Sequence, residues 1–171
     1  MPNNIDRSEA ELLGSLRSKE NLIDAIDATD PDWFVTFNTH RTNRYTSDIY
    51  QQTEFEVMLP LVQKWQRCMQ HRYPDIGTWD IWFELSDTGH IHAHAIWKEP
   101  VWKRGRTPEA FVTLAQQEWE RVTRGSWDGK KQRGKRRKTV YPRGDLHFKA
   151  YRNKDAIRYA SKAGSYMHRI G

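Results

Sequence analysis

The chain has 171 residues, of which 37% are apolar and eight are tryptophan, enough for one globular domain with a real core rather than a disordered chain. No run of about 18 apolar residues occurs, so we expect no membrane span, and Met1 to Ala10 lacks the apolar core of a secretion signal. Cys68 is the only cysteine, which excludes a disulfide within the chain and fits a reducing, intracellular compartment.

The net charge of +6 is unevenly distributed. Residues 1–97 carry 8 Lys/Arg and 15 Asp/Glu, a net of −7, whereas residues 98–171 carry 20 and 7, a net of +13. The basic half favours a polyanionic partner, and nucleic acid is the first candidate. A solvated charged face or a flexible tail is the alternative.

The first part of the chain predicts a helix, a strand and a second helix. Residues 8–28 begin with a capping-box pattern and carry apolar residues near helical spacing, and the Asp-Pro-Asp sequence at 30–32 ends this helix. Residues 33–38 are mostly aromatic and β-branched, which is typical of a strand. Residues 48–73 predict a long helix that Pro60 should kink or split.

Residues 78–98 predict a β-hairpin. Its first strand is rich in aromatic and β-branched residues, and Ser-Asp-Thr-Gly at 86–89 supplies the turn. The second strand alternates histidine with isoleucine or alanine, so His90, His92 and His94 share one face because strand side chains alternate with a period of two. The hairpin returns Glu84 to the side of this histidine row.

Two or three imidazoles and a carboxylate directed at one point form a candidate divalent metal site. The stretch contains no thiolate, which excludes a structural zinc site built on cysteines. Imidazole plus carboxylate, with positions open for water and phosphate, suits Mn²⁺ or Mg²⁺ acting as a Lewis acid. The alternative is a polar strand face with half-exposed histidines and no metal.

Residues 107–124 predict a further helix, with Thr107 as its N-cap and Pro108 at its first position. A polar segment at about 125–139 follows, and seven of the nine residues 130–138 are basic. Such a block cannot bury itself, so we expect a flexible loop that holds phosphate, acts as a nuclear-import signal or does neither. The candidates for DNA contact are Lys130, Lys131, Arg133, Lys135, Arg136, Arg137 and Lys138.

The C-terminal segment predicts strand and then helix. Residues 140–141 and 146–151 have strand composition around a turn. Asn153 or Asp155 is expected to cap a final helix that runs to about Met167.

Tyr159 and Lys162 lie one turn apart on that expected helix, near one face with Asp155, Ala163 and Tyr166. A free tyrosine hydroxyl is a poor nucleophile because its pKa is near 10. A metal-polarised phosphate eases its attack and a nearby ammonium stabilises developing charge, with a covalent phosphotyrosine as the product. The ordinary alternative is a tyrosine on a buried helix face with a lysine that reaches into water.

Taken together, these features resemble the single-tyrosine HUH endonucleases, and among them the Rep initiators of rolling-circle replicons in small circular single-stranded DNA viruses, phages and plasmids. Residues 33–38 look like the family's first motif, and His92-Ala93-His94 looks like its His-hydrophobe-His motif. The segment 159–162, Tyr-Ala-Ser-Lys, looks like the third. The resemblance spans about 33–166, with the motifs in the family's order.

The resemblance implies a role for each matching residue. Glu84, His92 and His94 would be the ligands of Mn²⁺ or Mg²⁺. Tyr159 would be the nucleophile, and Lys162 the assisting cation.

Three further residues are possible accessories of this site. His90 extends the histidine row beyond the usual pair and is a candidate DNA contact or alternative ligand. Asp155 lies one turn before Tyr159, where it could reach the metal or simply cap the helix. Tyr166 is the alternative nucleophile.

The resemblance also implies an α+β fold, in which helices flank a central antiparallel sheet of about five strands of the RNA-recognition or ferredoxin-like type. Residues 1–30 would form a helical extension, and residues 31–171 one compact endonuclease domain. Trp33, Trp79 and Trp97 could offer stacking faces to bases, with core packing as the alternative.

The implied activity is nicking and rejoining of single-stranded or hairpin origin DNA through a 5′-phosphotyrosine intermediate and a free 3′-hydroxyl. The chain has no Gly-x-x-x-x-Gly-Lys-Ser/Thr motif, so a helicase domain or host replication proteins would act from outside it. The expected location is the host nucleus for a eukaryotic virus and the cytoplasm for a bacterial replicon.

Two other functions compete with this one. A non-catalytic basic nucleic-acid-binding module, with structural histidines, accounts for the basic half and the aromatic residues equally well. A zinc-dependent hydrolase is the weaker alternative because the chain has no His-Glu-x-x-His pattern.

Overall fold

The computed structural model describes residues 4–42, 54–77, 79–85, 90–123, 144–162 and 166–170. Its elements in chain order are α1 (Asn4–Asp27), β1 (Trp33–Thr42), α2 (Glu54–Arg72), β2 (Trp79–Leu85), β3 (His90–Trp97), α3 (Pro108–Thr123), β4 (Asp145–Ala150), α4 (Lys154–Ala160) and β5 (Tyr166–Ile170).

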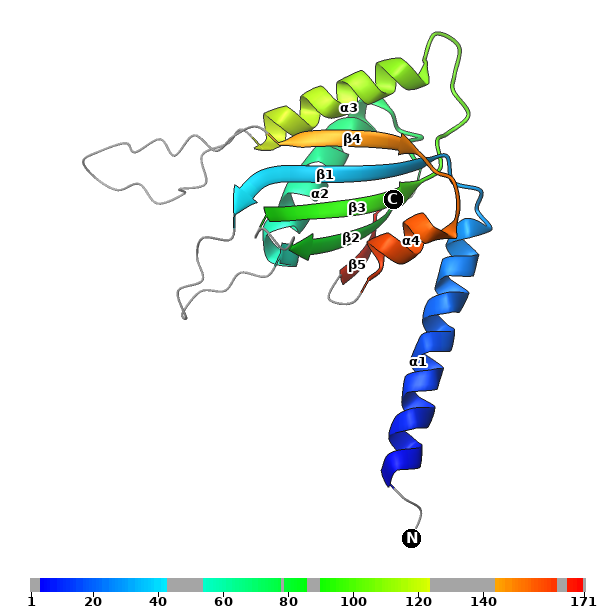
Figure 1. Cartoon of the computed structure of the whole chain (residues 1–171). Coiled ribbons are helices and arrows are strands. Elements are labelled where there is room, and N and C mark those ends of the chain that lie inside the picture. The colour runs from blue at the N-terminus through cyan, green and yellow to red at the C-terminus, as the bar shows by residue number, and fades with distance from the viewer. Residues whose placement is uncertain are drawn as a thin grey trace, which may run out of the picture.

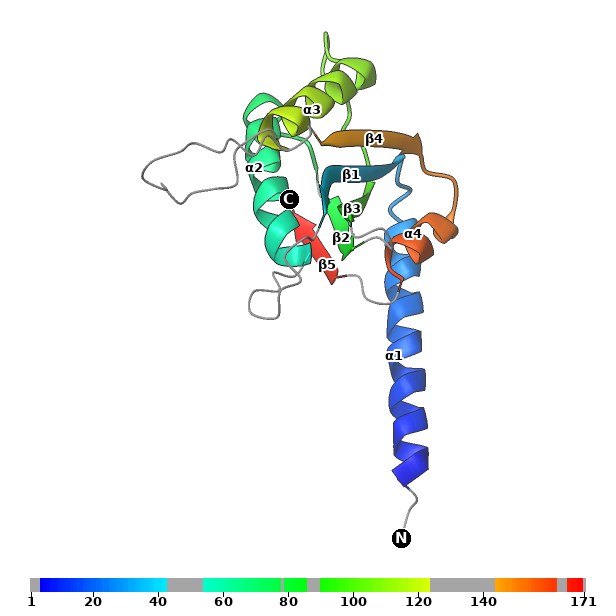
Figure 2. The same cartoon turned by 60° about the vertical axis from the view of Figure 1, so that its left-hand side comes forward.

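The strands form one sheet in the order β4-β1-β3-β2-β5, and every neighbouring pair is antiparallel. Helices α2 and α3 cover one face of this sheet, while α4 and the C-terminal end of α1 lie on the other side (Figures 1 and 2). The prediction of an α+β fold with an antiparallel sheet and flanking helices is confirmed. Within the described ranges, no helix is long and apolar enough to cross a membrane.

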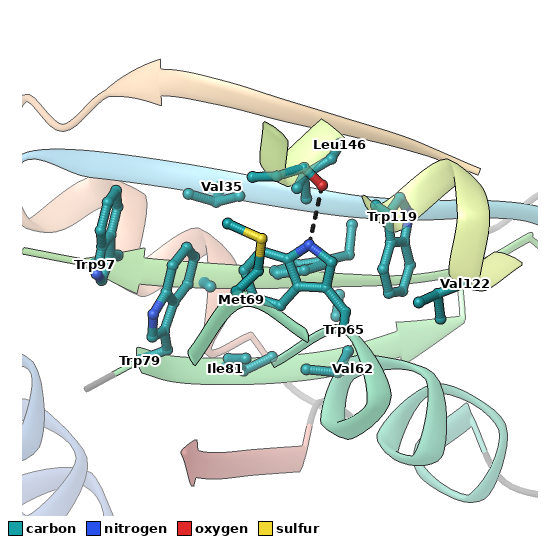
Figure 3. Packing of buried hydrophobic residues seen from close by; sticks show 14 of the residues in the cluster. Val35, Val62, Trp65, Met69, Trp79, Ile81, Trp97, Trp119, Val122 and Leu146 are labelled. Carbon is teal, nitrogen blue, oxygen red and sulfur yellow. Dashed lines mark hydrogen bonds between the residues drawn. The ribbon is translucent and has the colours of Figure 1, made fainter. Parts of the chain in front are cut away.

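The main core lies between the sheet and the α2/α3 layer, and tryptophans dominate it (Figure 3). Trp65, Trp79, Trp97 and Trp119 are all fully buried. A buried indole N–H needs an acceptor, and Trp65, Trp97 and Trp119 donate theirs to backbone carbonyl oxygens at 2.7–3.0 Å. Trp79 and Trp97 stack on each other inside this core, so they offer no face to a base, and the core-packing alternative holds for both.

A smaller apolar cluster lies on the opposite face of the sheet. It joins Ile23 and Ile26 of α1 to Ile157 and Ala160 of α4, and its sheet members are Trp82 and Ile96. This cluster anchors the C-terminal end of α1, whereas the N-terminal end of the helix projects away from the sheet (Figures 1 and 2).

Most element predictions are confirmed, with shifted ends. The hairpin strands are β2 and β3, and Thr107 Oγ1 accepts a hydrogen bond from the Ala110 N–H at the start of α3. Helix α2 continues through Pro60 without being split. Strand β1 is longer than predicted, since it continues past a register shift between Asn38 and Thr42.

The prediction of a final helix to Met167 is wrong. Helix α4 ends at Ala160, and residues 166–170 form β5, which pairs with β2. The physical reason is that β2 would otherwise present a row of unpaired backbone groups at the sheet edge. The spacing of apolar residues in the sequence carries no information about this pairing. Tyr166 therefore lies on a strand, and Lys162 lies beyond the helix.

Gly144, just before β4, provides a test of this packing. A Cβ built there would lie 2.4 Å from the Asn38 carbonyl oxygen and 2.8 Å from Trp119 Nε1, the two groups joined by a core hydrogen bond. We expect Gly144→Ala to lower the free energy of unfolding by about 1–3 kcal/mol, because the clash involves backbone and a fully buried ring.

The measurement is urea denaturation followed by tryptophan fluorescence. Gly14→Ala is the control, since its Cβ meets nothing within 4 Å on the exposed side of α1 and alanine favours a helix. Equal stability of Gly144→Ala and the wild type would contradict the described contact between β4, β1 and α3.

Candidate active site

The central strand β3 carries the histidine row between β1 and β2. His92 is paired with Asn38 of β1 and with Glu84 of β2, and His94 is paired with Thr36 of β1. Residues directly opposite in an antiparallel pair share a face of the sheet. The row lies on the side of α4 rather than on the α2/α3 side. Only the backbone of Glu84 and His90 is described, so the positions of their side chains remain predictions.

His94 is buried, with 5% of its surface exposed. Its Nδ1 lies 3.1 Å from Thr36 Oγ1, and its ring stacks on Phe34 with centroids 5.2 Å apart. A hydrogen bond between a ring nitrogen of histidine and a neighbouring oxygen fixes the orientation of the ring. The His92 ring, which is partly exposed, has its centroid 5.0 Å from that of His94.

Helix α4 brings Tyr159 to this row. The centroid of the Tyr159 ring lies 5.2 Å from that of His94 and 6.3 Å from that of Phe34. The Nζ of Lys162 lies 4.9 Å from the same ring. Tyr159 is 54% exposed, so its ring contacts the histidine while its surface stays accessible to a substrate.

Local sequence explains why α4 presents the tyrosine this way. Asn153 caps the helix, with its side chain accepting a hydrogen bond from the Asp155 N–H. Ile157 and Ala160, three residues apart, are buried against the sheet and α1. These two buried residues fix the rotation of the helix about its axis, and this rotation sets the direction in which Tyr159 projects.

Of the proposed accessory residues, the structure describes the side chain of Asp155 and the backbone of Tyr166. The Asp155 carboxylate is exposed and accepts a hydrogen bond from Arg158 at 3.2 Å, while the capping role falls to Asn153. Tyr166 is paired in register with Phe83, a residue of the main core. The basic residues 130–138 lie outside the described residues.

Strand β4 adds two polar residues that the sequence did not single out. The register pairs His147 with Thr36 and Asp145 with Asn38, and the His147 and Asp145 side chains are in contact through Nε2 and Oδ2. The alternating Asp-x-His pattern indicated a shared face, but only the sheet register relates that face to the histidine row.

A fit to a divalent cation depends on the donor set. Neighbouring imidazoles on one strand, with a carboxylate residue paired across the hairpin, are suitable ligands for such a cation. Among the side chains that the structure describes, no three His, Cys, Asp or Glu residues lie close enough together to hold a metal ion. The side chains of His92 and His94 are among those described, and the side chain of Glu84 is not.

Comparisons of this chain with protein-family models, with curated proteins and with solved structures found no significant match. An assignment of function therefore depends on the chemistry of the site.

The contact between Thr36 and His94 can be tested without any assay of activity. Thr36→Val keeps the shape of the side chain but removes the hydroxyl at His94 Nδ1. We expect a shift in the tautomer populations of His94 in long-range ¹H–¹⁵N spectra, since this bond contributes about 0.5–1.5 kcal/mol to one ring state. The exposed Thr113→Val is the control, and an unaltered His94 spectrum in Thr36→Val would argue against the bond.

Proposed function

We propose that this chain is a metal-dependent DNA endonuclease and strand transferase of the single-tyrosine HUH type, acting as Rep initiators do. The observation that carries the proposal is the placement of the Tyr159 ring, 5.2 Å from the ring of His94 and open to solvent. An accessible tyrosine beside one imidazole, with a second imidazole next to the first, suits a tyrosine nucleophile.

The topology supports the same family. The element order β1-α2-β2-β3-α3-β4, with the sheet order β4-β1-β3-β2, corresponds to the split βαβ arrangement of ferredoxin-like domains. Helix α1, helix α4 and strand β5 are additions to this core. In the proposal, the chemistry takes place on the sheet face opposite α2 and α3.

Glu84, His92 and His94 would hold Mn²⁺ or Mg²⁺ in this proposal. When bound, the cation would supply Lewis-acid polarisation of the scissile phosphate. His94 is suited to this role because Thr36 occupies its Nδ1 side, and His92 because it is partly exposed next to it.

The reacting group is Tyr159. Its Oη forms a bond to phosphorus as the bond between phosphorus and the 3′-oxygen breaks; the phenol loses its proton, and the leaving oxygen takes one up. The products are a 5′-phosphotyrosine and a free 3′-hydroxyl that can prime synthesis. The ammonium of Lys162 lies near the tyrosine ring, where it can stabilise charge on the phenolate or the phosphate. Attack by a 3′-hydroxyl on the phosphotyrosine reverses the step and rejoins the strand.

The substrate in this proposal is single-stranded or hairpin origin DNA. The net charge of +13 in residues 98–171 supports an anionic partner, and the basic residues 130–138 are the proposed DNA contacts. Helicase activity would come from another domain or from host proteins. The replicon then sets the location, which is the nucleus for a eukaryotic virus and the cytoplasm for a bacterial replicon.

The decisive experiment is a covalent adduct assay with oligonucleotides from a panel of replicon origins and Mn²⁺. We expect the wild type to give a protein–DNA adduct on a denaturing gel and Tyr159→Phe to give none, because phenylalanine lacks the attacking oxygen. Tyr73→Phe, on the α2/α3 side, is the matched control and should keep the adduct. Persistence of the adduct in Tyr159→Phe would indicate Tyr166 or another nucleophile, and a wild type that binds DNA without an adduct would favour the non-catalytic binding module.

A second prediction concerns the two imidazoles. His92→Ala and His94→Ala should each reduce the adduct to the level of wild type treated with a chelator, and should weaken Mn²⁺ binding measured by calorimetry. His71→Ala, at the exposed end of α2, should change neither. Normal Mn²⁺ affinity in both site variants would reject these histidines as ligands.

A further inference from the structure

Helix α4 cannot fix its own position. It has seven residues, from Lys154 to Ala160, and isolated helices of that length are not stable in water. Its place on the sheet, and with it the place of Tyr159, must therefore come from tertiary contacts. Many of these contacts come from α1, a helix that the HUH resemblance does not include.

The apolar part of the contact is fully buried. Ile23 and Ile26 of α1 are 1% and 2% exposed, and they belong to one cluster with Ile157 and Ala160 of α4. Ile96, which follows His94 by two residues on β3, completes the link to the histidine row. Dense packing of this kind transmits displacements of the α1 side chains to α4.

Three polar contacts continue the same stripe along α1. Glu20 accepts from Arg158 at 3.1 Å, Asp24 from Lys154 at 2.7 Å, and Asp27 from the Tyr151 hydroxyl at 2.6 Å. Burial, followed by the hydrogen bond to Asp27, raises the pKa of Tyr151, which keeps this phenol protonated as a donor. The two ion pairs are solvent-exposed and contribute little energy, so they orient the helices that the isoleucines hold together.

We infer that the last two turns of α1 position the tyrosine of the active site. Ile23 and Ile26 are positioning residues, which act through Ile157 and Ala160 to hold the Tyr159 ring against His94. The catalytic meaning of this inference depends on the proposed function, whereas the mechanical coupling of α1 to α4 does not. In-line attack on a phosphate requires a nucleophile in the correct place, so loosening α4 should slow the chemistry more than it weakens DNA binding.

The test compares Ile26→Ala with Ile76→Ala, the same substitution in the main core on the other side of the sheet. Ile76 is equally buried but belongs to a different cluster, so it reports general loss of stability. Both full-length variants are studied at a temperature where unfolding curves show them to be folded. The readouts are hydrogen exchange of the α4 amides, single-turnover adduct formation at saturating DNA, and the affinity for DNA.

We expect Ile26→Ala to accelerate exchange in residues 154–161 and to slow adduct formation by about 10- to 100-fold, with little change in DNA affinity. Ile26→Val should restore most of the rate because it keeps most of the buried volume. Ile76→Ala should leave both the α4 exchange and the rate close to the wild type. Should Ile26→Ala not fold, Arg158→Glu replaces it, with a smaller loss of less than about fivefold that the added Glu20→Arg substitution should restore.

The outcomes distinguish failure of the proposed coupling between α1 and α4 from failure of the proposed endonuclease activity. Unchanged exchange in α4 of Ile26→Ala would overturn the inference whatever the activity, and so would equal slowing in Ile76→Ala. A wild type that forms no adduct, together with faster α4 exchange in Ile26→Ala, would remove the proposed chemistry but support the coupling of α1 to α4.

Discussion

The register of three antiparallel strands is the constraint on which the rest of this structure depends. With β3 between β1 and β2, the alternation of side chains places alanines and large apolar residues on one face and the two described histidines on the other. A shift of one residue would exchange these faces and bury the imidazoles among the tryptophans. One pairing pattern thus sets both the core and the candidate site.

The aromatic core makes that register costly to change. Trp65 of α2 and Trp119 of α3 both pack edge-on against Phe37 of β1, each with its ring centroid 5.0 Å from that of Phe37. Their indole N–H groups bond to backbone oxygens of Ala115 and Asn38, which ties α2 to α3 and α3 to β1. The two described histidines lie on the opposite face, beside the smaller apolar cluster.

That second face is built from three segments that lie far apart in the sequence. The residues of β3 supply the imidazoles, α4 supplies the phenol, and the end of α1 holds α4 in place through buried isoleucines. The position of Tyr159 is therefore a property of contacts between segments more than 100 residues apart in the sequence. A short helix on a rigid sheet is a suitable carrier for a nucleophile, since a few contacts determine its orientation.

The sequence by itself determined the two strands of the hairpin, the shared face of His92 and His94 and the start of α3, because strand alternation and helix caps are local properties. The α+β class came from the family resemblance, with which the order of these elements agrees. The sequence also indicated Tyr159 as a residue of interest through a recognisable motif. Only the tertiary structure decided that residues 166–170 form an edge strand, that Thr36 and Phe34 hold His94, and that α1 supports α4. These features depend on which segments pair or pack across the sheet, and no local pattern of hydrophobicity or spacing specifies that choice of partner.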